Sequence, residues 1–380
     1  MRVERLELTD FRNHDALAVD LPAGVSVLVG PNGVGKTNVL EAIGYLATLG
    51  SHRVGQDASL VRDGADAALL RARALREGRR VQVDVELRPG SGVRGRVNGA
   101  AVPRSRDLLG VVRATVFAPE DLGLIRGDPE ERRRFLDSLA TQRLPRYLGS
   151  RQDYERVLRQ RNTLLRSAAG RLPASALTTL DVWDEKLVAA GAEIWAERLR
   201  LVAVLTPLVV RAYRRLAARD DLVAASYVSS LGEQGDLDPH PDPDPAKLGQ
   251  LLRERLLSDR TREVERGITL TGPHRDDLAL SLRGLPARTH ASHGEAWSLA
   301  LALRLAAHWL LADEGEQPVL LLDDVFAELD RGRRRRVAEV TSAAEQAVVT
   351  ASVAEELPPG LQAAVFHVEP GAIRSGGRHG

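Results

Sequence analysis

The sequence predicts an α/β protein with two lobes, of which one is assembled from both ends of the chain and the other is mainly helical. Three observations support this fold class. A glycine-rich loop separates a strand pattern from a helix pattern near the N-terminus, the middle of the chain has helical periodicity, and apolar strand patterns return towards the C-terminus. With 380 residues, 43% of them apolar, the chain can bury a substantial core.

The first lobe begins with strand patterns at residues 2–8 and 25–29, followed by apolar residues at helical spacing over 37–50. Alternating segments between about 67 and 117 predict further strands, and the pair Asn98-Gly99 suits a tight hairpin turn. We therefore assign residues 1–119 to the N-terminal part of this lobe.

The helical lobe is assigned to residues 120–265. Its clearest start signal is Asp128, an N-cap candidate that is followed by proline at the first helical position and by two acids in the first turn. Alternating Asp and Pro over 232–245 predict an extended, mobile surface loop. The lobe lacks a heptad array long enough for an extended coiled coil, so no long coiled coil is expected.

The first lobe is expected to resume over residues 266–380. Its C-terminal part carries a strand pattern, a long helix, an apolar strand and one final strand. The segments concerned are GITLTGPHRDD (267–277), DLALSLRG (277–284), a helix from Ser292 to about Asp313, PVLLLDD (318–324) and QAVVTAS (346–352).

The composition excludes several classes of protein. The chain has no cysteine, so it can form neither a disulfide framework nor a thiolate metal site, which fits a reducing compartment, and we expect a cytoplasmic protein. The N-terminus lacks the pattern of an export signal, and the longest apolar runs are too short to cross a membrane. Because the formal net charge is only +1, a DNA-binding surface would require local segregation of charge.

The loop after the second strand pattern has the residues needed to bind phosphate. It matches the phosphate-loop pattern in the strand-to-helix context that the pattern requires, and a fortuitous glycine-rich turn is the weaker alternative. Its glycines let successive amides point into one concavity, Lys36 reaches the outer phosphates of ATP, and Thr37 can ligate Mg²⁺. The expected nucleotide contacts are Gly30, Pro31, Asn32, Gly33, Val34, Gly35, Lys36, Thr37 and Asn38.

The apolar strand at 318–324 ends in two carboxylates. Asp323 is placed to hold Mg²⁺ opposite Thr37, and Asp324, on the other side of the strand end, to orient or deprotonate the attacking water. An ordinary strand followed by an acidic turn is the alternative, which the phosphate loop upstream makes less favoured.

The segment Ser292-His293-Gly294-Glu295 has two compatible interpretations. Ser292 and Glu295 form a capping box, and such boxes begin many helices that bind no ligand. A serine hydroxyl, a glycine amide and a helix N-terminus also make an anion site together. The position shortly before the acidic strand favours the functional interpretation, and one serine can serve both purposes.

The order of these elements, with Asp330 following the acidic strand, resembles that of ABC-type ATPases. In that family the Ser-x-Gly element belongs to the opposing subunit. The resemblance therefore implies an ABC-type P-loop ATPase head of which two copies sandwich ATP, so that Ser292 and Gly294 of one chain cap the γ-phosphate held by Lys36 of the other. It also implies that Asp330 lies in the loop that crosses the dimer interface, and that Lys36, Asp324, Ser292, Gly294 and Asp330 form the catalytic set.

Dispersed segments along nearly the whole chain match a narrower family. They are LELTDFRNH (6–14), GPNGVGKTN (30–38), SHR (51–53), VNG (97–99), DLLG (107–110), FAPEDL (117–122), RRRFLD (132–137), GPHRDDL (272–278) and LLLDDVFAELD (320–330). With these segments the chain resembles the RecF family, which is similar to the heads of SMC proteins without their long coiled coils.

The resemblance to the RecF family implies an ATP-dependent, DNA-binding recombination mediator in bacterial DNA repair and replication. It implies an ATP-induced homodimer that clamps double-stranded DNA, in particular near junctions with single strands, and helps load recombinase at gaps with the partners RecR and RecO. Hydrolysis of ATP would be weak, stimulated by DNA, and would release the DNA; no membrane is involved.

Two other classes of protein stay open. The ATPase subunit of an ABC transporter has the same nucleotide chemistry, although the long helical insert and the dispersed segments weigh against it. The other class is a scaffold that uses ATP only for stability.

The chain also departs from the pattern of these families. His293 stands where RecF relatives often carry glutamine, and the place of a switch histidine falls within 349–352, where hydroxyl groups cannot act as a cationic switch, so slow hydrolysis is expected. Glu120 and Asp121 fall where related ATPases have a loop that contacts water or metal.

Basic residues that could contact DNA form three short groups. These are Arg132–Arg134, Arg333–Arg336 and His52-Arg53, although a surface arginine run is more often a solvated helix face. His274 and Arg275 could equally be structural, with the arginine paired to the adjacent acids.

Overall fold

The computed structural model describes residues 1–54, 57–167, 174–231, 237–327 and 329–379, and these fold into two compact units. The first unit comprises 1–125, 208–221 and 291–380, and the second comprises 126–207 and 222–290. The expected ranges 1–119, 120–265 and 266–380 differ from these units, because residues 120–125 and 208–221 belong to the first unit and 266–290 to the second.

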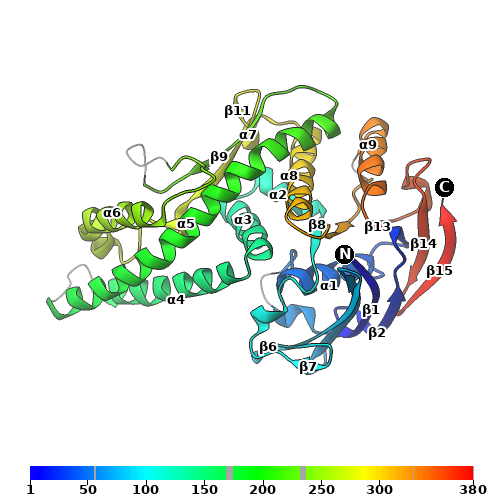
Figure 1. The fold of residues 1–380 in the computed structure, drawn as a ribbon, viewed down its shortest axis with the longest axis horizontal. Coiled ribbons are helices and arrows are strands. Elements are labelled where there is room, and N and C mark those ends of the chain that lie inside the picture. Colours follow the sequence, from blue (N-terminus) through cyan, green and yellow to red (C-terminus); the bar gives the residue numbers. More distant parts are fainter. Residues whose placement is uncertain (55–56, 168–173, 232–236, 328, 380) are drawn as a thin grey trace. The chain divides into compact units, whose positions relative to one another are not determined.

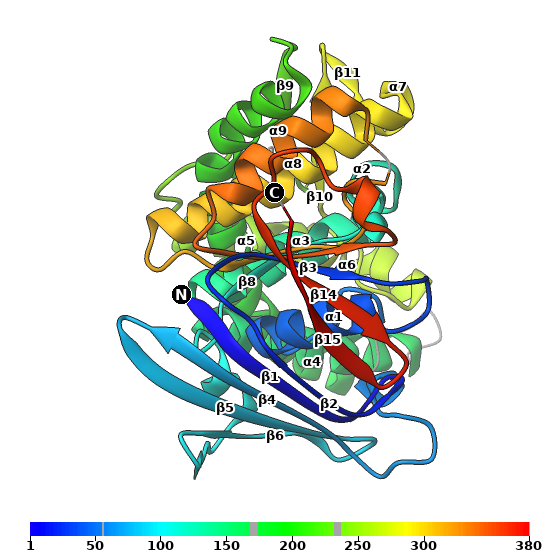
Figure 2. The same cartoon turned by 90° about the vertical axis from the view of Figure 1, so that its right-hand side faces the viewer.

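The central sheet of the first unit has the strand order β15-β14-β3-β13-β12-β8. All of its neighbours are parallel except β14 and β15, which lie side by side at its edge (Figure 2). Its strands are β3 (Gly24–Val29), β8 (Ala114–Phe117), β12 (Val319–Leu322), β13 (Gln346–Ala351), β14 (Ala363–Glu369) and β15 (Ala372–His379). The carboxyl ends of β3, β8, β12 and β13 therefore meet at one edge, which is where a ligand binds in open α/β sheets.

A second, antiparallel sheet of the first unit has the order β2-β1-β4-β5-β6-β7. Asn98 and Gly99, with φ of 50° and 83°, form the tight turn between β6 and β7 that the sequence predicts. The strands are β1 (Arg2–Phe11), β2 (His14–Asp20), β4 (Ala68–Arg76), β5 (Arg79–Arg88), β6 (Gly92–Val97) and β7 (Ala100–Ala101). The main apolar core of the unit joins residues of both sheets to α1 (Lys36–Thr48).

The remaining helices of the first unit carry or flank the sequence motifs. They are α2 (Gly123–Arg126), α8 (His293–Asp313), α9 (Arg331–Ser342) and the short 3₁₀ helices η1 (Asp57–Leu60), η2 (Ser105–Leu108), η3 (Pro119–Leu122) and η5 (Ala354–Glu356). Ser292 caps α8 through the capping box with Glu295, as the sequence predicts. The helix ends at Asp313, also as expected.

The second unit is mainly helical and contains the small sheet β11-β10-β9 (Figure 1). Its elements are α3 (Pro129–Arg143), α4 (Arg146–Ser167), α5 (Ala174–Ala217, of which 208–217 belong to the first unit), β9 (Val223–Val228), α6 (Pro245–Arg266), η4 (Pro273–Arg275), β10 (Asp277–Leu282), β11 (Leu285–Pro286) and α7 (Ala287–His290). The proline that begins α3 follows the N-cap residue Asp128, where the sequence places a helix start.

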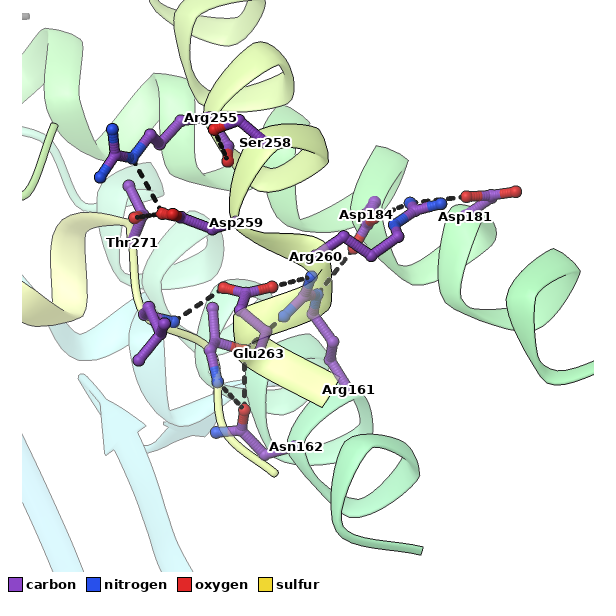
Figure 3. Close-up of polar contacts among 12 residues, drawn as sticks. Arg161, Asn162, Asp181, Asp184, Arg255, Ser258, Asp259, Arg260, Glu263 and Thr271 are labelled. Atoms are coloured by element: carbon purple, nitrogen blue, oxygen red, sulfur yellow. Dashed lines mark hydrogen bonds and ion pairs between the residues drawn. The ribbon is translucent and has the colours of Figure 1, made fainter. Parts of the chain in front are cut away.

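A buried network of charges joins the helices of the second unit (Figure 3). Arg161 on α4 is fully buried, and it pairs with Asp184 on α5 and with Glu263 on α6 at 2.6 Å each. Asp259 accepts hydrogen bonds from Arg255 and from the hydroxyl of Thr271. Buried charges of this kind are tolerated only when they are paired.

The segment 267–276 is not the strand that its alternating residues predict. Its backbone and hydroxyl groups bond to side chains instead: Asn162 accepts from the amide of Thr269 at 2.8 Å, and Glu263 accepts from the amide of Leu270 at 2.8 Å. Only β10, from Asp277, matches the expected strand pattern of this region. The strand expected at 346–352 is confirmed as β13 (Gln346–Ala351), but it is not the last one, because β14 and β15 follow it.

Two expected features fall partly outside the described residues. The Asp/Pro-rich connector lies outside them at 232–236, and the segment after the acidic strand lies outside them at Glu328. Residues 237–244 form neither helix nor strand before α6 begins. No helix of the described ranges is long and apolar enough to cross a membrane.

Candidate nucleotide site

The phosphate loop lies between β3 and α1, at the carboxyl edge of the central sheet. Gly33 and Gly35 have φ of 85° and 107°, which side chains with a Cβ rarely adopt. A Cβ on Gly35 would also lie 2.5 Å from Nε2 of His14 and 2.7 Å from Oδ1 of Asn13. The loop therefore needs glycine at this position both for its backbone conformation and for its close approach to the DFRNH segment.

Lys36 is almost fully buried at the first residue of α1. Its Nζ donates to the carbonyl oxygens of Gly30 at 2.7 Å and of Pro31 at 3.0 Å, so that the ammonium group is held over the loop. Asn32 and Asn38 flank this arrangement; Asn32 accepts a hydrogen bond from Ser352, and Asn38 donates to Asn13 at 2.7 Å. The ammonium group is thus placed where an anion cradled by the loop would meet it.

Thr37 and Asp323 are brought together although they are 286 positions apart. The hydroxyl of Thr37 donates to Oδ1 of Asp323 at 3.0 Å, and the hydroxyl of Thr350 donates to the same oxygen at 2.6 Å. Burial raises the pKa of Asp323, and these two hydroxyl groups oppose that rise. Within the part of the chain that the structure describes, no arginine or lysine pairs with this carboxylate.

Asp324 has a left-handed backbone, with φ of 44°, which is uncommon for a residue other than glycine. Its amide donates to the hydroxyl of Thr350 at 2.8 Å. Thr350 therefore fixes both carboxylate residues, by donating to Asp323 and accepting from Asp324. From the sequence, this hydroxyl is only a group that cannot act as a cation. Its double contact depends on the pairing of β13 with β12, which no local pattern reveals.

A second set of residues supports α1 from the N-terminal strands. Glu41 is fully buried and takes two hydrogen bonds from the guanidinium group of Arg12, at 2.6 and 2.9 Å. Although burial raises the pKa of this carboxyl, the bonds from Arg12 and Ser51 hold it below its ordinary value. Arg53 donates to Asn38 at 3.1 Å and lies 3.5 Å from Glu41. The matching segments at 6–14 and 51–53 thus meet beside the phosphate loop.

The acids of η3 differ in their surroundings. Asp121 is buried and pairs with Arg304 of α8 through both of its oxygens. Glu120 is half exposed, and its carboxylate lies 3.6 Å from Arg53. Asp121 is therefore occupied by a fixed cation, and Glu120 is the member of the pair that can face a ligand.

Arg333 of α9 links Gly294 of the Ser-x-Gly element to Asp330. The hydroxyl of Ser292 bonds to Glu295. A Cβ on Gly294 would lie 2.6 Å from Nη1 of Arg333, and the same nitrogen lies 3.3 Å from the carboxylate of Asp330. Asp330 caps α9, and its bond from the amide of Arg333 lowers its pKa.

Most of the basic residues proposed for DNA contact are engaged within the chain. Arg132 is buried against Asp277, Arg133 donates to the carbonyl oxygen of Asp276, and Arg134 pairs with acids of its own helix. Arg132 is therefore excluded as a surface residue that could contact DNA. Burial lowers the pKa of His52.

The GPHRDD segment is structural in its contacts, but not in the way that the sequence suggests. Arg275 donates to the carbonyl oxygen of Thr269 rather than to the adjacent acids. His274 bonds to Tyr154 at 2.7 Å, and burial lowers its pKa to about 4. Asp276 accepts from Tyr227 at 2.7 Å, among other donors.

The residues at the sheet edge fit ATP with Mg²⁺. The loop offers backbone amides and one lysine for phosphate, and the hydroxyl of Thr37 beside an acidic oxygen supplies the hard donors that Mg²⁺ prefers. The buried carboxylate of Asp323 has only neutral hydroxyl groups as hydrogen-bond donors, so a cation would relieve its burial.

Comparison with known proteins identifies the family. Residues 2–358 match the family model described as the RecF/RecN/SMC N terminal domain. The DNA replication and repair protein RecF of Streptomyces avermitilis is 52% identical over 380 residues, which cover 98% of this chain and 99% of that protein. RecF of Frankia alni is 50% identical over 381 residues, with coverage of 98% and 99%.

Solved structures agree with this relationship. A structure of the recombination mediator protein RecF with ATP, from the RecFOR pathway, has a TM-score of 0.87 at 25% identity and covers 98% of this chain and 97% of its own. An Smc head bound to the winged-helix domain of ScpA has a TM-score of 0.53 at 15% identity, with coverage of 98% and 96%, which shows the fold alone. The predicted ABC-type head is confirmed, the transporter alternative is not favoured, and the chain belongs to the RecF family.

Proposed function

We propose that this protein is an ATP-dependent, DNA-binding recombination mediator that acts in bacterial DNA repair and replication. The relatives named RecF and the RecF structure with ATP support this assignment. The observation that carries it is the contact of Thr37 with Asp323 beside Lys36, since this trio is what binding and hydrolysis of ATP require at the edge of the sheet.

The chemistry follows from the groups at this edge. Mg²⁺ held by Thr37 and Asp323 would neutralise charge on the β- and γ-phosphates. Lys36 exchanges its carbonyl partners for phosphate oxygens, and Asp324 orients the attacking water while Thr350 fixes its backbone. Because no histidine occupies the switch position, we expect the hydrolysis of ATP to be weak. As the family implies, we also expect DNA to stimulate it.

The site is proposed to be shared between two chains. Ser292 and Gly294 of one protomer would cap the γ-phosphate held by its partner, and Asp330 would lie at the interface. The N-terminus of α8 suits this role because Ser292 and Gly294 are exposed or half exposed there. A phosphate that bridges both chains would hold the dimer, and its loss on hydrolysis would loosen it.

The dimer is proposed to clamp double-stranded DNA, in particular near junctions with single strands. Hydrolysis then acts as a timer that releases DNA rather than as a motor. RecR and RecO are the protein partners that the family implies, and with them the clamp would help load recombinase at gaps.

The substitution Ser292→Arg tests the shared site. An arginine at the exposed cap of α8 would fill the space for the partner's γ-phosphate, so we expect ATP with Mg²⁺ to dimerise the wild type and not the variant. The molar mass in solution, measured by light scattering with and without ATP, reports the difference.

The matched control is Ser167→Arg, which adds the same charge at the exposed end of α4. It should dimerise like the wild type, and nucleotide binding by each monomer should stay intact in both variants. A wild type that remains monomeric with ATP, or a Ser292→Arg variant that dimerises fully, would contradict the shared site.

A further inference from the structure

The C-terminal end of α5 and the helix α9 lie side by side in the first unit, and both are rich in arginine (Figure 1). Nε of Arg336 donates to the carbonyl oxygen of Leu216 at 2.6 Å, which fixes the contact. Arg335 precedes Arg336, Arg215 precedes Leu216, and both of these arginines are exposed. We call the exposed set Arg215, Arg219, Arg331 and Arg335 the arginine ridge.

Contacts within the chain account for the other arginines of this region but not for the ridge. Arg214 and Arg333 each pair with a carboxylate of the first unit, and Arg334 donates to the carbonyl oxygen at 329. The four ridge side chains have no hydrogen bond or ion pair with any residue that the structure describes. Their guanidinium groups are therefore available to a ligand from outside the chain.

The stability of the helix α9 does not explain why Arg331 and Arg335 are arginines. Arg331 is the first residue of the helix, where a cation opposes the helix dipole, and Arg335 follows it at a spacing of four, where like charges repel. Glu339, four residues further on, forms no ion pair with Arg335 in the described residues. An external anion would compensate both unfavourable terms.

The character of the surface favours phosphate over a protein partner. None of the large apolar side chains that are exposed in the described residues lies within 208–221 or 331–342, whereas the core of a protein interface is apolar. Guanidinium groups pair well with phosphate, and a duplex offers phosphates at regular spacing. We propose that the arginine ridge binds the phosphate backbone of duplex DNA, an inference that rests on the proposed function.

The ridge is also connected to the nucleotide site through α9. This helix begins directly after Asp330, and Arg333 in its first turn pairs with Asp330 and lies against Gly294. A γ-phosphate at the Ser-x-Gly element and DNA on the ridge would thus both act on the first turns of α9. This provides a short physical route by which ATP changes the affinity for DNA.

The double substitution Arg215→Gln with Arg335→Gln tests the ridge in the full-length protein. The affinity for a fluorescent duplex is measured by anisotropy over a series of salt concentrations, with ATP and Mg²⁺ present. We expect weaker binding, and a decrease of about 2 in the slope of log K against log salt, because each phosphate contact contributes about 0.9. The melting temperature should not fall, since both side chains are exposed and unpaired and Arg335 is repelled by Arg331.

The matched control is Arg94→Gln with Arg96→Gln on β6. It removes the same charge from exposed arginines of the same unit, but these line a groove together with Glu7, Asp84 and Glu86, so that the surface has mixed sign. The control should retain the wild-type slope.

The outcomes distinguish the ridge from the proposed function. If the wild type fails to bind duplex DNA, both are contradicted. If the wild type binds and the ridge variant binds with the same slope, or if both double variants lose affinity equally, the ridge alone is overturned. Loss of binding to a protein partner, with DNA binding intact, would likewise overturn it and assign the surface to an acidic protein.

Discussion

Two Asp-Asp pairs lie in different units of this protein, and their surroundings are opposite in kind. In the second unit, Asp276 accepts hydrogen bonds from an indole, a phenol and a backbone amide, and Asp277 is paired with a guanidinium group. In the first unit, Asp323 has two hydroxyl donors and Asp324 contacts one of them. Burial raises the pKa of both Asp276 and Asp323, so burial alone does not separate them.

The partners make the difference. A carboxylate surrounded by rigid donors or fixed cations is satisfied by the fold itself, and any ligand would have to displace those groups. A carboxylate that has hydroxyl groups as its only donors is less fully satisfied, because each hydroxyl proton can rotate away from it, and such a carboxylate suits a metal ion. The donors around an Asp-Asp pair, and not the motif itself, therefore show which pair can do chemistry.

The largest difference between the two pairs should appear in catalysis. The substitution Asp324→Asn removes the proposed water-orienting carboxylate, and we expect ATP hydrolysis to fall by about 10² to 10⁴, the range for general base catalysis. ATP-dependent dimerisation should persist, because the phosphate contacts remain. Release of phosphate measured at saturating ATP reports the rate.

Asp277→Asn is the matched substitution in the second unit. It alters the pair with Arg132 but no group of the nucleotide site, so the folded variant should hydrolyse ATP at the wild-type rate. Equal losses of activity in the two variants would show that the comparison of donors fails to identify the catalytic pair.

The next largest effect should be on stability, in the network of the second unit. Arg161→Met leaves the fully buried Glu263 without its cation, and breaking one partner of a buried pair costs about 3–5 kcal/mol. We expect the free energy of unfolding to fall by this amount in urea titrations followed by tryptophan fluorescence, for which Trp183 and Trp195 lie in the same unit.

The control substitution is Arg253→Gln, which removes an exposed pair with Glu185 in the same unit. Water and salt screen such a pair, so its loss should change the free energy of unfolding far less. If both substitutions have the same small effect, the buried network does not hold the second unit together.

The sequence predicts those parts of the fold that depend on local patterns. The helix α8 runs from its cap at Ser292 to Asp313, and the loop before α1 lies between a strand and a helix, as expected. The expectation fails where distant partners decide. Segment 267–276 alternates like a strand, but its groups bond to Asn162 and Glu263, and β15 pairs with β14 in spite of its glycines.

The site shows the same division. The juxtaposition of Thr37 with Asp323 follows from two motifs at the carboxyl ends of parallel strands, and it is present in the structure. The role of Thr350 and the contact of Gly294 with Arg333 depend on pairing and packing between distant segments. For the same reason Arg132, in a run that resembles a basic surface, is buried against an acid 145 positions away.

The smallest predicted effect is a stability difference at Asp323. The substitution Asp323→Asn removes a buried charge that only hydroxyl groups support, and the hydroxyl groups of Thr37 and Thr350 can rotate to suit the amide. We therefore expect the nucleotide-free variant to be more stable than the wild type at neutral pH by about 1 kcal/mol, as is common when an active-site residue is replaced. Binding of ATP with Mg²⁺ should weaken.

The pH dependence of this difference tests its cause. Because burial raises the pKa of Asp323 above its unfolded value, the wild type carries the cost of the buried charge at any pH above the raised pKa. As the pH falls through that pKa the folded wild type binds a proton, the cost shrinks, and below the unfolded value it vanishes. The two proteins should therefore become equally stable in acid when compared by urea unfolding, and a difference that is constant with pH would show that the charge of Asp323 is not its source.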